Sequence, residues 1–354
     1  MAKSNDFLDN MINNCDSAEN FNVECIDHYD NDRDGYLNFQ ECCSLLEDVC
    51  KSTTYKLSRE YKDRIFNLLD EDKDGKICTE DFRRCVYYWL KQTMKPVSAF
   101  IIVDVQNDFI SGSLSLLGCP AGHDGAEVIP VINHLLDSVP FDLVVYTKDW
   151  HPENHISFVE NVQNRPLAKN CKIKAGEAKV YDTVEFDGPP RTEQTLWPKH
   201  CVTNTWGSEL HPDLKIMDNA EFVKKGCHSD VDSYSAFWDN NKLSQTDLVR
   251  ILARHKVTDV YVCGVAYDVC VGYTALHALE HGFRTVLVDD ACKGVDAKGI
   301  EETKRKLVDS GGIIVHSSQV KNIVAGEDRP APLGLQSAKN VALARELVNR
   351  GIVK

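Results

Sequence analysis

Hydrophobic residues follow two different patterns along the chain, and the change falls near Lys95 and Pro96. Beyond that point, short continuous apolar runs alternate with stretches of helical periodicity. The runs that predict strands are 99–105, 143–149, 220–226, 259–265, 284–291 and 312–318. Helices are predicted between them, including 126–139, 245–256 and 270–282. Continuous apolar strands separated by helices are typical of a parallel sheet covered on both faces. We therefore expect an α/β domain with a doubly wound, mostly parallel sheet.

The chain before this domain is predicted to be a small all-α domain. Apolar segments with helical spacing, such as FNVECIDHY, YKDRIFNLL and DFRRCVYYWL, flank two short acidic turns. The predicted domains are residues 1–95, residues 96–326, and a Pro-containing linker with a C-terminal amphipathic helix at 327–354. That helix is expected to dock on the core or on a second subunit. A homo-oligomer is therefore one of the two predicted arrangements.

The charge of the chain is negative and unevenly distributed. The net charge is −14, and residues 1–95 hold 20 acidic and 13 basic residues, or −7. This balance disfavours nucleic acid or an anionic membrane as a partner. No apolar run approaches the ~20 residues of a membrane span, and the first residues lack a secretion-signal pattern. The 14 cysteines include no C-x-x-C pair. Reduced thiols and a cytoplasmic location are expected, with the nucleus left open.

The first acidic turn, DNDRDGYLNFQE (30–41), has the ligand order of an EF-hand loop. Gly35 occupies the sixth position, where the sharp turn requires positive φ. Loop positions 1, 3, 5, 7, 9 and 12 are Asp30, Asp32, Asp34, Tyr36, Asn38 and Glu41. The spacing predicts a calcium site, whereas an acidic solvated turn is the alternative. The recurrence of the pattern forty residues later favours the calcium site.

The second acidic turn, DEDKDGKICTED (70–81), repeats the plan with two departures. Its predicted ligand residues are Asp70, Asp72, Asp74, Lys76 and Asp81. Position 12 is aspartate, whose shorter side chain reaches an ion less easily with both oxygens, and Cys78 at position 9 offers no oxygen. We expect this loop to bind calcium more weakly than the first loop, or to prefer magnesium.

Polar residues lie at or just beyond the ends of four of the predicted strands, on the edge of the sheet where ligands bind in open α/β folds. These residues are Asp104, Asp149 with His151, Lys225, and Cys270. They are expected to converge. The glycine-rich signatures GxGxxG, in the first strand–helix turn, and GxxxxGK[ST] are absent from the sequence, which disfavours nucleotide enzymes of those types.

Cys270 lies where the strand 259–265 gives way to the helix 270–282. The unpaired N–H groups and partial positive charge of a helix N-terminus favour a thiolate, so we predict an easily deprotonated nucleophile. The alternative is a buried structural cysteine. Cys201, Cys227 and Cys263 are other candidates, but packing in a loop, a turn and a strand accounts for them.

Five motifs in sequence resemble the nicotinamidase/pyrazinamidase branch of the isochorismatase-like cysteine hydrolases. They are IIVDVQNDF, TKDWHPENHISF, WPKHCVTNTWG, KGCHSDVDSYSAF and GVAYDVCVGYTA. The resemblance covers roughly residues 98–320, and an EF-hand pair in front of it is similar to the animal form of that enzyme. It implies hydrolysis of nicotinamide to nicotinate and ammonia through a cysteine thioester, in NAD salvage.

The resemblance also implies roles for individual residues. Asp104 takes the thiol proton of Cys270 and later gives it to ammonia, while Lys225, rather than Lys224, holds both in their charged forms. The family carries a cis peptide that falls here at Val265-Ala266. It implies an oxyanion hole formed by the N–H groups of Ala266 and Cys270.

A metal and an aromatic pocket complete what the resemblance implies. The metal, of zinc type, is held by Asp149, His151 and His200 and orients the pyridine ring, with His155 left open as a fourth ligand. The predicted substrate walls are Phe109, Trp197 and Tyr234, although core packing uses the same residue types. Two other functions stay open at this point. They are a cysteine amidase acting on another small amide, and a calcium-sensing module with an inactive hydrolase domain.

Overall fold

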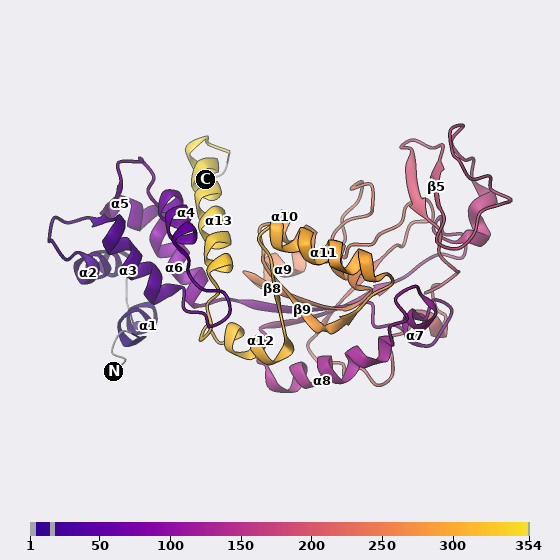
Figure 1. The fold of residues 1–354 in the computed structure, drawn as a ribbon, viewed down its shortest axis with the longest axis horizontal. Coiled ribbons are helices and arrows are strands. Elements are labelled where there is room, and N and C mark those ends of the chain that lie inside the picture. Colours follow the sequence, from indigo (N-terminus) through magenta and orange to yellow (C-terminus); the bar gives the residue numbers. More distant parts are fainter. Residues whose placement is uncertain (1–4, 15–17, 353–354) are drawn as a thin grey trace. The chain divides into compact units, whose positions relative to one another are not determined.

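The structure, a computed structural model, describes residues 5–14 and 18–352 and divides the chain into two compact units. One unit is Ser98–Lys321, and the other combines Met1–Val97 with Asn322–Lys354 (Figure 1). The C-terminal segment therefore belongs to the same unit as the N-terminal helices, although more than two hundred residues separate them in sequence.

The α/β unit is built on a six-stranded parallel sheet in the order β10-β9-β8-β3-β4-β7. All six predicted strands are present, so the expectation of a doubly wound α/β fold is confirmed. Their bounds are β3 Ser98–Val103, β4 Leu143–Asp149, β7 Glu221–Lys225, β8 Asp259–Val265, β9 Arg284–Lys293 and β10 Ile313–Val315. In the register, Ile101 of β3 lies opposite Val145 of β4 and Val262 of β8. All three side chains are fully buried. Strands covered on both faces need apolar residues at every position, so they appear in the sequence as continuous apolar runs.

Helices cover both faces of this sheet. Figure 1 shows α10 and α11 on one face and α8 on the other. The helices of the unit are α7 Asn107–Ile110, α8 Val128–Ser138, α9 Leu248–Arg254, α10 Gly272–Glu280 and α11 Ala297–Asp309, and α12 Ser317–Val324 crosses its end. Single 3-10 or π turns are η2 Leu116–Gly118, η3 Gly125–Glu127, η4 Val159–Asn164, η5 Trp206–Ser208 and η6 Tyr267–Val271. A separate hairpin pairs β5 Thr183–Phe186 with β6 Thr192–Thr195.

The strand order places the reversal of the sheet between β3 and β8. The chain starts at β3, builds outward through β4 and β7, then returns to the other side of β3 with β8 and continues through β9 to β10. In open α/β sheets, ligands bind beyond the carboxyl ends of the two strands that flank such a reversal. Here those ends lead into Asp104 and into the turn that carries Cys270.

The helical unit forms around two antiparallel loop strands, β1 Leu37–Asn38 and β2 Lys76–Ile77. Its helices are α1 Asn5–Asn14, α2 Ala18–Tyr29, α3 Phe39–Val49, α4 Arg59–Leu69, α5 Thr79–Asp81, η1 Phe82–Val86, α6 Tyr87–Met94 and α13 Ala331–Asn349. One apolar core joins them and includes Phe21, Phe82 and Trp89 together with Leu335 and Ala338 of α13. The predicted paired helix–loop–helix arrangement is confirmed.

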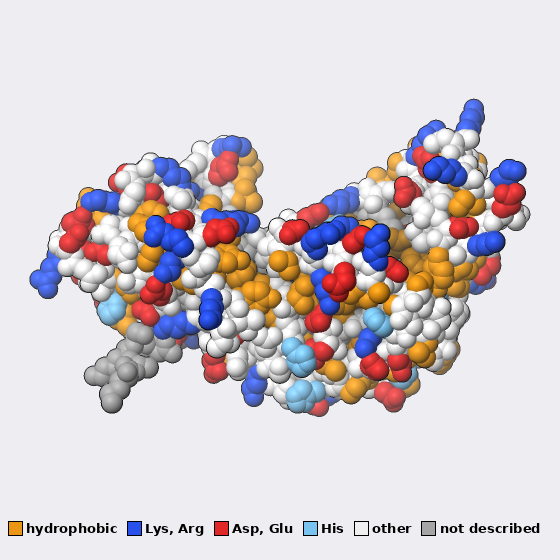
Figure 2. All heavy atoms as spheres, in the orientation of Figure 1, with side chains coloured by type: hydrophobic (Ala, Val, Ile, Leu, Met, Phe, Trp, Pro, Cys, Tyr) orange, Lys and Arg blue, Asp and Glu red, His pale blue; other side chains and the backbone are white. Residues whose placement is uncertain are grey.

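The surface of the helical unit mixes both signs of charge. Figure 2 shows acidic and basic side chains interspersed over its visible face. Among the described residues, no helix is both long enough and apolar enough to cross a membrane.

Gly264 is the tightest point of contact between β8 and β3. Its φ is +114°, and a Cβ at this position would lie 2.1 Å from the carbonyl oxygen of Val103. We expect Gly264→Ala to lower the free energy of unfolding by about 3 kcal/mol or more, because strain and overlap both act on buried strands. Urea denaturation measures the effect. Gly118→Ala is the control, since a Cβ there meets nothing within 4 Å, and equal stabilities of the two variants would contradict the prediction.

Candidate active site and cation-binding loops

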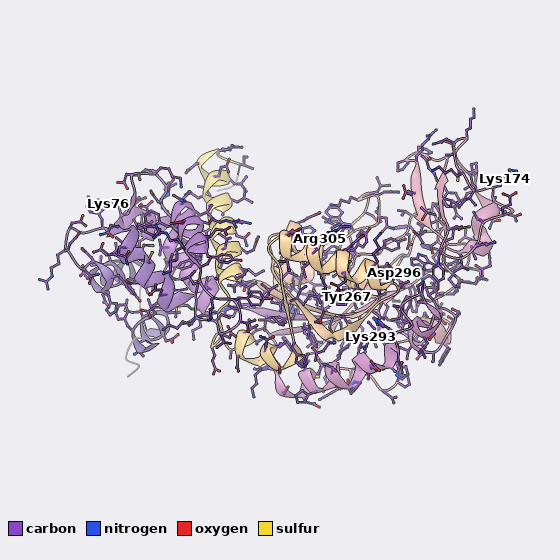
Figure 3. All side chains as sticks on the ribbon, in the orientation of Figure 1. Lys76, Lys174, Tyr267, Lys293, Asp296 and Arg305 are labelled. Atoms are coloured by element: carbon purple, nitrogen blue, oxygen red, sulfur yellow. The ribbon has the colours of Figure 1, made fainter. Side chains whose placement is uncertain are left out.

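Cys270 lies in the π turn η6, directly after β8 and before α10. Tyr267, labelled in Figure 3, begins this turn. The peptide bond between Val265 and Ala266 is cis, as the family resemblance implies. The Cys270 side chain is buried, yet it lines a pocket together with Ala266 and Val269. The thiol is therefore held inside the protein at the wall of a cavity.

The ammonium group of Lys225 connects the three residues expected to form the catalytic set. Its Nζ lies 2.9 Å from Asp104 Oδ2 and donates a hydrogen bond of 3.2 Å to Cys270 Sγ. It also donates to the Ser233 carbonyl oxygen at 2.9 Å. The Lys225 side chain is 0% exposed, so its charge depends on these partners and not on water.

Asp104 reaches the site because the chain bends sharply after β3. Its φ is +50°, an uncommon value for a residue other than glycine. Oδ1 accepts a hydrogen bond of 2.5 Å from the Thr147 hydroxyl. Among the described residues, Oδ2 accepts no directed hydrogen bond, although Lys225 lies beside it. A carboxylate oxygen of Asp104 lies within 4.8 Å of Cys270 Sγ. Oδ2 is thus free to accept a proton.

The pKa values of Cys270, Asp104 and Lys225 are all raised above their ordinary values. Burial raises the pKa of the Cys270 thiol well above its usual value, and Lys225 only partly opposes that effect. Burial likewise raises the pKa of Asp104. Although burial acts to lower the pKa of Lys225, the carboxylates of Asp104 and Asp149 raise it. Burial therefore opposes the stabilisation of the Cys270 thiolate by the helix N-terminus and by Lys225, so an easily deprotonated thiol stays a prediction.

Asp149 joins this cluster to a group of imidazoles. Its Oδ1 accepts a hydrogen bond of 2.6 Å from Lys225 Nζ. Its Oδ2 lies 3.6 Å from His151 Nε2 and 3.9 Å from His200 Nε2. Although burial acts to raise the pKa of Asp149, Lys225 and His151 hold that pKa well below its usual range. The carboxylate of Asp149 thus contacts both the Lys225 ammonium and the two histidine rings.

The two histidines are oriented as metal ligands. His151 Nδ1 lies 2.9 Å from the carbonyl oxygen of Gly226, and His200 Nδ1 lies 2.7 Å from that of Pro198. A carbonyl accepts but cannot donate, so each Nδ1 carries the hydrogen and each Nε2 offers its lone pair toward Asp149. Burial, with the charge of His151, lowers the pKa of His200 to about 4, which keeps that ring neutral. These three residues fit a divalent ion of zinc type.

Gly226 makes the close packing around His151 possible. It has a φ of +64°, and a Cβ at this position would lie 2.3 Å from Cε1 of His151. The residue directly after Lys225 must therefore be glycine if the ring of His151 is to stay against the backbone.

His155 lies beside this group but faces a different carboxylate. Its ring stacks on His151 with a centroid distance of 4.0 Å, and its Nδ1 lies 2.7 Å from the Ser157 hydroxyl. His155 Nε2 is 4.0 Å from Asp232 Oδ1. Ligand atoms of His151, His155 and Asp232 lie within 4.8 Å of one another, as do those of Asp149, His151 and His200. The structure thus groups His155 with Asp232, a residue that the sequence analysis did not single out.

The pocket beside Cys270 spans about 390 Å³ when the open space at its mouth is included. The three aromatic residues expected to be substrate walls, Phe109, Trp197 and Tyr234, all line it. Aliphatic side chains complete the walls, namely Leu114, Leu116, Val269 and Val295. Such a largely apolar space with a few polar groups suits a small heteroaromatic ring.

Two buried polar residues that the sequence analysis missed position the ligands. Gln106 pairs with the backbone of Asp149, accepting from its N–H at 2.7 Å and donating to its carbonyl at 2.9 Å. Asp108 Oδ2 accepts from the N–H of Cys201 at 2.7 Å, which fixes the loop that carries His200. Both residues stand within the quoted motif IIVDVQNDF, but their partners are backbone groups more than forty residues away.

Both acidic turns of the helical unit form compact loops. Ligand oxygens of Asp30, Asp32 and Glu41 lie within 4.8 Å of one another in the first loop, and those of Asp70, Asp72 and Asp74 do so in the second. Within the first loop, Glu41 also accepts hydrogen bonds from the N–H groups of Asn31 and Asn38, at 2.8 and 3.0 Å. The carboxyl groups of both loops suit a hard cation such as calcium.

The remaining predicted ligands lie at the edges of these loops. Lys76, labelled in Figure 3, directs its Nζ to Asp34 Oδ2 at 2.7 Å and lies over the Tyr36 ring. Asp81 accepts from the N–H groups of Glu71 and Cys78, both at 2.9 Å. At position 7 of each loop, Tyr36 and Lys76 therefore have only a backbone carbonyl to offer a cation.

The sequence profile described as "Isochorismatase domain" matches residues 98–319, which is more than half of the chain. The chain belongs to the isochorismatase family. A second profile, described as "EF hand", matches residues 62–86, which contain the second loop. The predicted resemblance to this family and the predicted EF-hand are thus both confirmed.

Relatives of this isochorismatase-family chain include several nicotinamidases. It is 37% identical over 215 residues to the nicotinamidase of Acinetobacter baylyi, covering 60% of this chain and 89% of that enzyme. With the nicotinamidase of Saccharomyces cerevisiae it shares 37% identity over 223 residues, covering 60% of this chain and 95% of that enzyme. With that of Schizosaccharomyces pombe it shares 40% identity over 198 residues, covering 55% and 82%.

Solved structures of this family superpose on the α/β unit. An Acinetobacter baumanii nicotinamidase/pyrazinamidase gives a TM-score of 0.54 at 37% identity, covering 63% of this chain and 98% of that one. The yeast nicotinamidase Pnc1p gives a TM-score of 0.53 at 35% identity, covering 62% and 99%. The likeness covers nearly the whole of each of these enzymes and leaves more than a third of this chain outside it.

We expect removal of His200 to release the metal without unfolding the protein. His200→Ala deletes one neutral nitrogen ligand, and loss of a ligand lowers metal affinity strongly. Metal content after dialysis against a chelator, measured by mass spectrometry, should fall at least tenfold relative to the unsubstituted protein. His211→Ala is the control, because the ring of that histidine contacts Asp213, which is not one of the predicted metal ligands. Equal retention of metal by both variants would remove His200 from the ligand set.

Loss of Lys225 should destabilise the protein in a pH-dependent way. Lys225→Met leaves Asp104 and Asp149 buried without their ammonium, so their folded-state pKa values rise above those of the unfolded chain. A raised folded pKa gives stability that is lost as pH increases. In metal-free protein, the stability gap between variant and unsubstituted protein should therefore widen from pH 5 to pH 8 in urea denaturation. Lys224→Met, which removes an ammonium stacked on Trp150, should show no such widening. A constant gap would contradict the prediction.

Proposed function

We propose that this protein hydrolyses nicotinamide to nicotinate and ammonia, a reaction of NAD salvage. The relatives that it matches over most of their length are named nicotinamidases. The structure of a Leishmania infantum relative, with a TM-score of 0.50 and 33% identity, is a complex with nicotinate. The yeast enzyme is known bound to the inhibitor nicotinaldehyde, with a TM-score of 0.51. The aromatic pocket of this chain supports the same ring as its substrate.

A single observation carries the assignment of the chemistry. The buried ammonium of Lys225 contacts a carboxylate at 2.9 Å, a second carboxylate at 2.6 Å and a thiol at 3.2 Å. A thiol beside a proton acceptor and a fixed positive charge is the arrangement of nucleophilic catalysis by cysteine. An intact set of this kind disfavours an inactive hydrolase domain that serves only calcium sensing.

In the first half of the reaction, Asp104 removes the proton of Cys270 as its sulfur attacks the carboxamide carbon. The C–S bond forms and the carbonyl oxygen takes the negative charge, which the N–H groups of Ala266 and Cys270 stabilise. The Asp104 carboxyl then gives its proton to the amide nitrogen, the C–N bond breaks and ammonia leaves. Because the pKa values of thiol and carboxyl are both raised by burial, the proton moves between two groups that favour their neutral forms.

In the second half, water enters the place that ammonia has left. Asp104 takes a proton from this water, whose oxygen attacks the thioester carbon. The C–S bond breaks, the sulfur regains the proton and nicotinate is released. Throughout, Lys225 keeps Asp104, Asp149 and Cys270 at fixed separations and balances the charge that passes between them.

The substrate ring is held between the aromatic side chains of Phe109, Trp197 and Tyr234. Asp149, His151 and His200 would hold a divalent metal, of zinc type, that supplies an electrophilic contact for the ring nitrogen and so orients the carboxamide toward Cys270. The same Asp149 carboxylate contacts Lys225, so the orientation of the ring and the position of the nucleophile share one support.

The acidic loops of the helical unit are proposed to bind calcium, the first loop more tightly than the second. Glu41 converges with Asp30 and Asp32 in the first loop, whereas the shorter Asp81 stands at the corresponding position of the second. A structural or weakly regulatory role is supported by the shared core of the two hands. The cytoplasm is the proposed location, in agreement with the free thiols of the described cysteines.

Replacement of the nucleophile is the direct test of the function. Cys270→Ala should lower kcat for ammonia release from nicotinamide by at least about a thousandfold, because it removes the thiol that accepts a hydrogen bond from Lys225. Cys263→Ala, which alters another buried cysteine of the same strand region, should keep most of the activity. Circular dichroism and metal content should match the unsubstituted protein in both variants. Ammonia release that survives in Cys270→Ala would overturn the assignment.

A further inference from the structure

The C-terminal helix α13 packs against the second EF-hand. The helix α4 enters the second loop, and η1 continuing into α6 leaves it. Figure 1 shows α13 alongside α4 and α6 in the helical unit. Paired EF-hands present an apolar face to an amphipathic target helix, and here a segment of the same chain occupies that place. The apolar core of the hands includes Ala331, Leu335, Ala338 and Val341 of this helix.

The first half of α13 approaches the hands closely through a glycine. The indole N–H of Trp89, on α6, donates a hydrogen bond of 2.8 Å to the carbonyl oxygen of Gly334. A Cβ on Gly334 would lie 2.8 Å from the sulfur of Cys50. Ser337 donates to Gln92 of α6 at 3.0 Å, so this half is fixed by shape and by directed bonds.

The second half of α13 reaches the ion-binding loop itself. Arg345 contacts the Cys85 sulfur at 2.9 Å and the Leu68 carbonyl at 3.4 Å, and its Nε lies 3.8 Å from Glu71 Oε1. Asn349 donates to the same Glu71 oxygen at 3.2 Å. Arg345 therefore contacts the helix before the loop, the turn after it and the loop between them.

Glu71 connects these contacts to a predicted ligand of the cation. It occupies position 2 of the second loop, and its N–H donates a hydrogen bond of 2.9 Å to Asp81 Oδ1. Asp81 is the twelfth residue of that loop, where the ion takes its last carboxylate. The backbone of Glu71 thus holds a ligand, while its side chain holds α13.

We propose that docking of α13 and binding of a divalent cation in the second loop are thermodynamically linked through Glu71 and the two helices that flank the loop. The proposal rests on the proposed binding of cations by the acidic loops. Docked α13 holds α4 and η1 at a fixed separation, so less order has to be gained when the ion binds. Linkage is reciprocal, and the bound ion strengthens the docking of α13 by the same factor.

The second loop is the one that gains most from such support. Its twelfth residue is the shorter Asp81, so its own ligands reach the ion less well than those of the first loop. A helix supplied in cis compensates for that shorter reach by holding the loop in its binding geometry.

The experiment uses the full chain with Asp32→Ala added, which weakens the first loop and leaves the second as the measured site. Gly334→Leu is the displacing variant, since its side chain would overlap Cys50 while leucine favours the helix itself. Ala344→Leu is the matched control, because it adds the same side chain on an exposed position of α13. Calorimetry measures calcium affinity, and hydrogen exchange of residues 331–349 measures docking with and without calcium.

We expect calcium to slow exchange in α13, and Gly334→Leu to speed that exchange and weaken calcium binding about fivefold or more. Ala344→Leu should change neither. Fast exchange in Gly334→Leu with unchanged calcium affinity would overturn the linkage. If the Asp32→Ala protein with an unchanged α13 binds no calcium, the proposal that the second loop binds a cation is overturned instead. Neither result bears on the proposed hydrolysis of nicotinamide.

If Gly334→Leu does not fold, Arg345→Ala is the second variant. It removes the contact with Glu71, and Arg350→Ala is its control, because Arg350 pairs with Glu346 on the exposed side of the same helix. Weaker calcium binding in Arg345→Ala alone supports the linkage. Equal affinity in both variants overturns it.

Discussion

A positive charge with no access to water governs the arrangement of the α/β unit's functional site. The ammonium of Lys225 would be strongly disfavoured in the interior unless negative partners surrounded it. Asp104 and Asp149 supply those partners from the ends of β3 and β4, and Cys270 completes the set from the turn after β8. Each of these groups would be unfavourable alone. Their mutual dependence explains why four segments that are distant in sequence meet at one point on the edge of the sheet.

Much of the α/β unit is predictable from sequence because buried parallel strands appear there as continuous runs of apolar residues. The strand at 143–149 has the predicted bounds, while β9 continues to Lys293, two residues beyond its predicted end. The convergence of Asp104, Lys225 and Cys270 follows from the rule that ligands bind at the carboxyl ends of strands. Gln106, Asp108 and Asp232 were missed because hydrogen bonds to distant segments leave no periodic signal. The effect of burial on the pKa of Cys270 also leaves no signal in the sequence, because burial depends on the packing of the whole unit.

Asp149 shows how two tasks can be supported by one side chain. One oxygen faces the ammonium and the other faces the imidazoles of His151 and His200. Because the two oxygens of a carboxylate are rigidly connected, a shift of the predicted metal ligands is also a shift of Lys225. In the proposed reaction, the orientation of the substrate ring and the placement of the sulfur are thereby coupled, and the backbone contacts of Gln106 fix Asp149, on which both depend.

The pairing of the N-terminal helices with α13 makes the helical unit discontinuous in sequence. The α/β unit, Ser98–Lys321, is in effect an insertion between two parts of that unit. During synthesis from the N-terminus, the two hands emerge long before the helix that completes their core, and the intervening domain can fold first. Trp89 and its apolar neighbours then stay uncovered until residues 331–349 arrive. A stop codon before residue 331 would therefore damage the structure of the two hands, which precede the α/β unit in sequence.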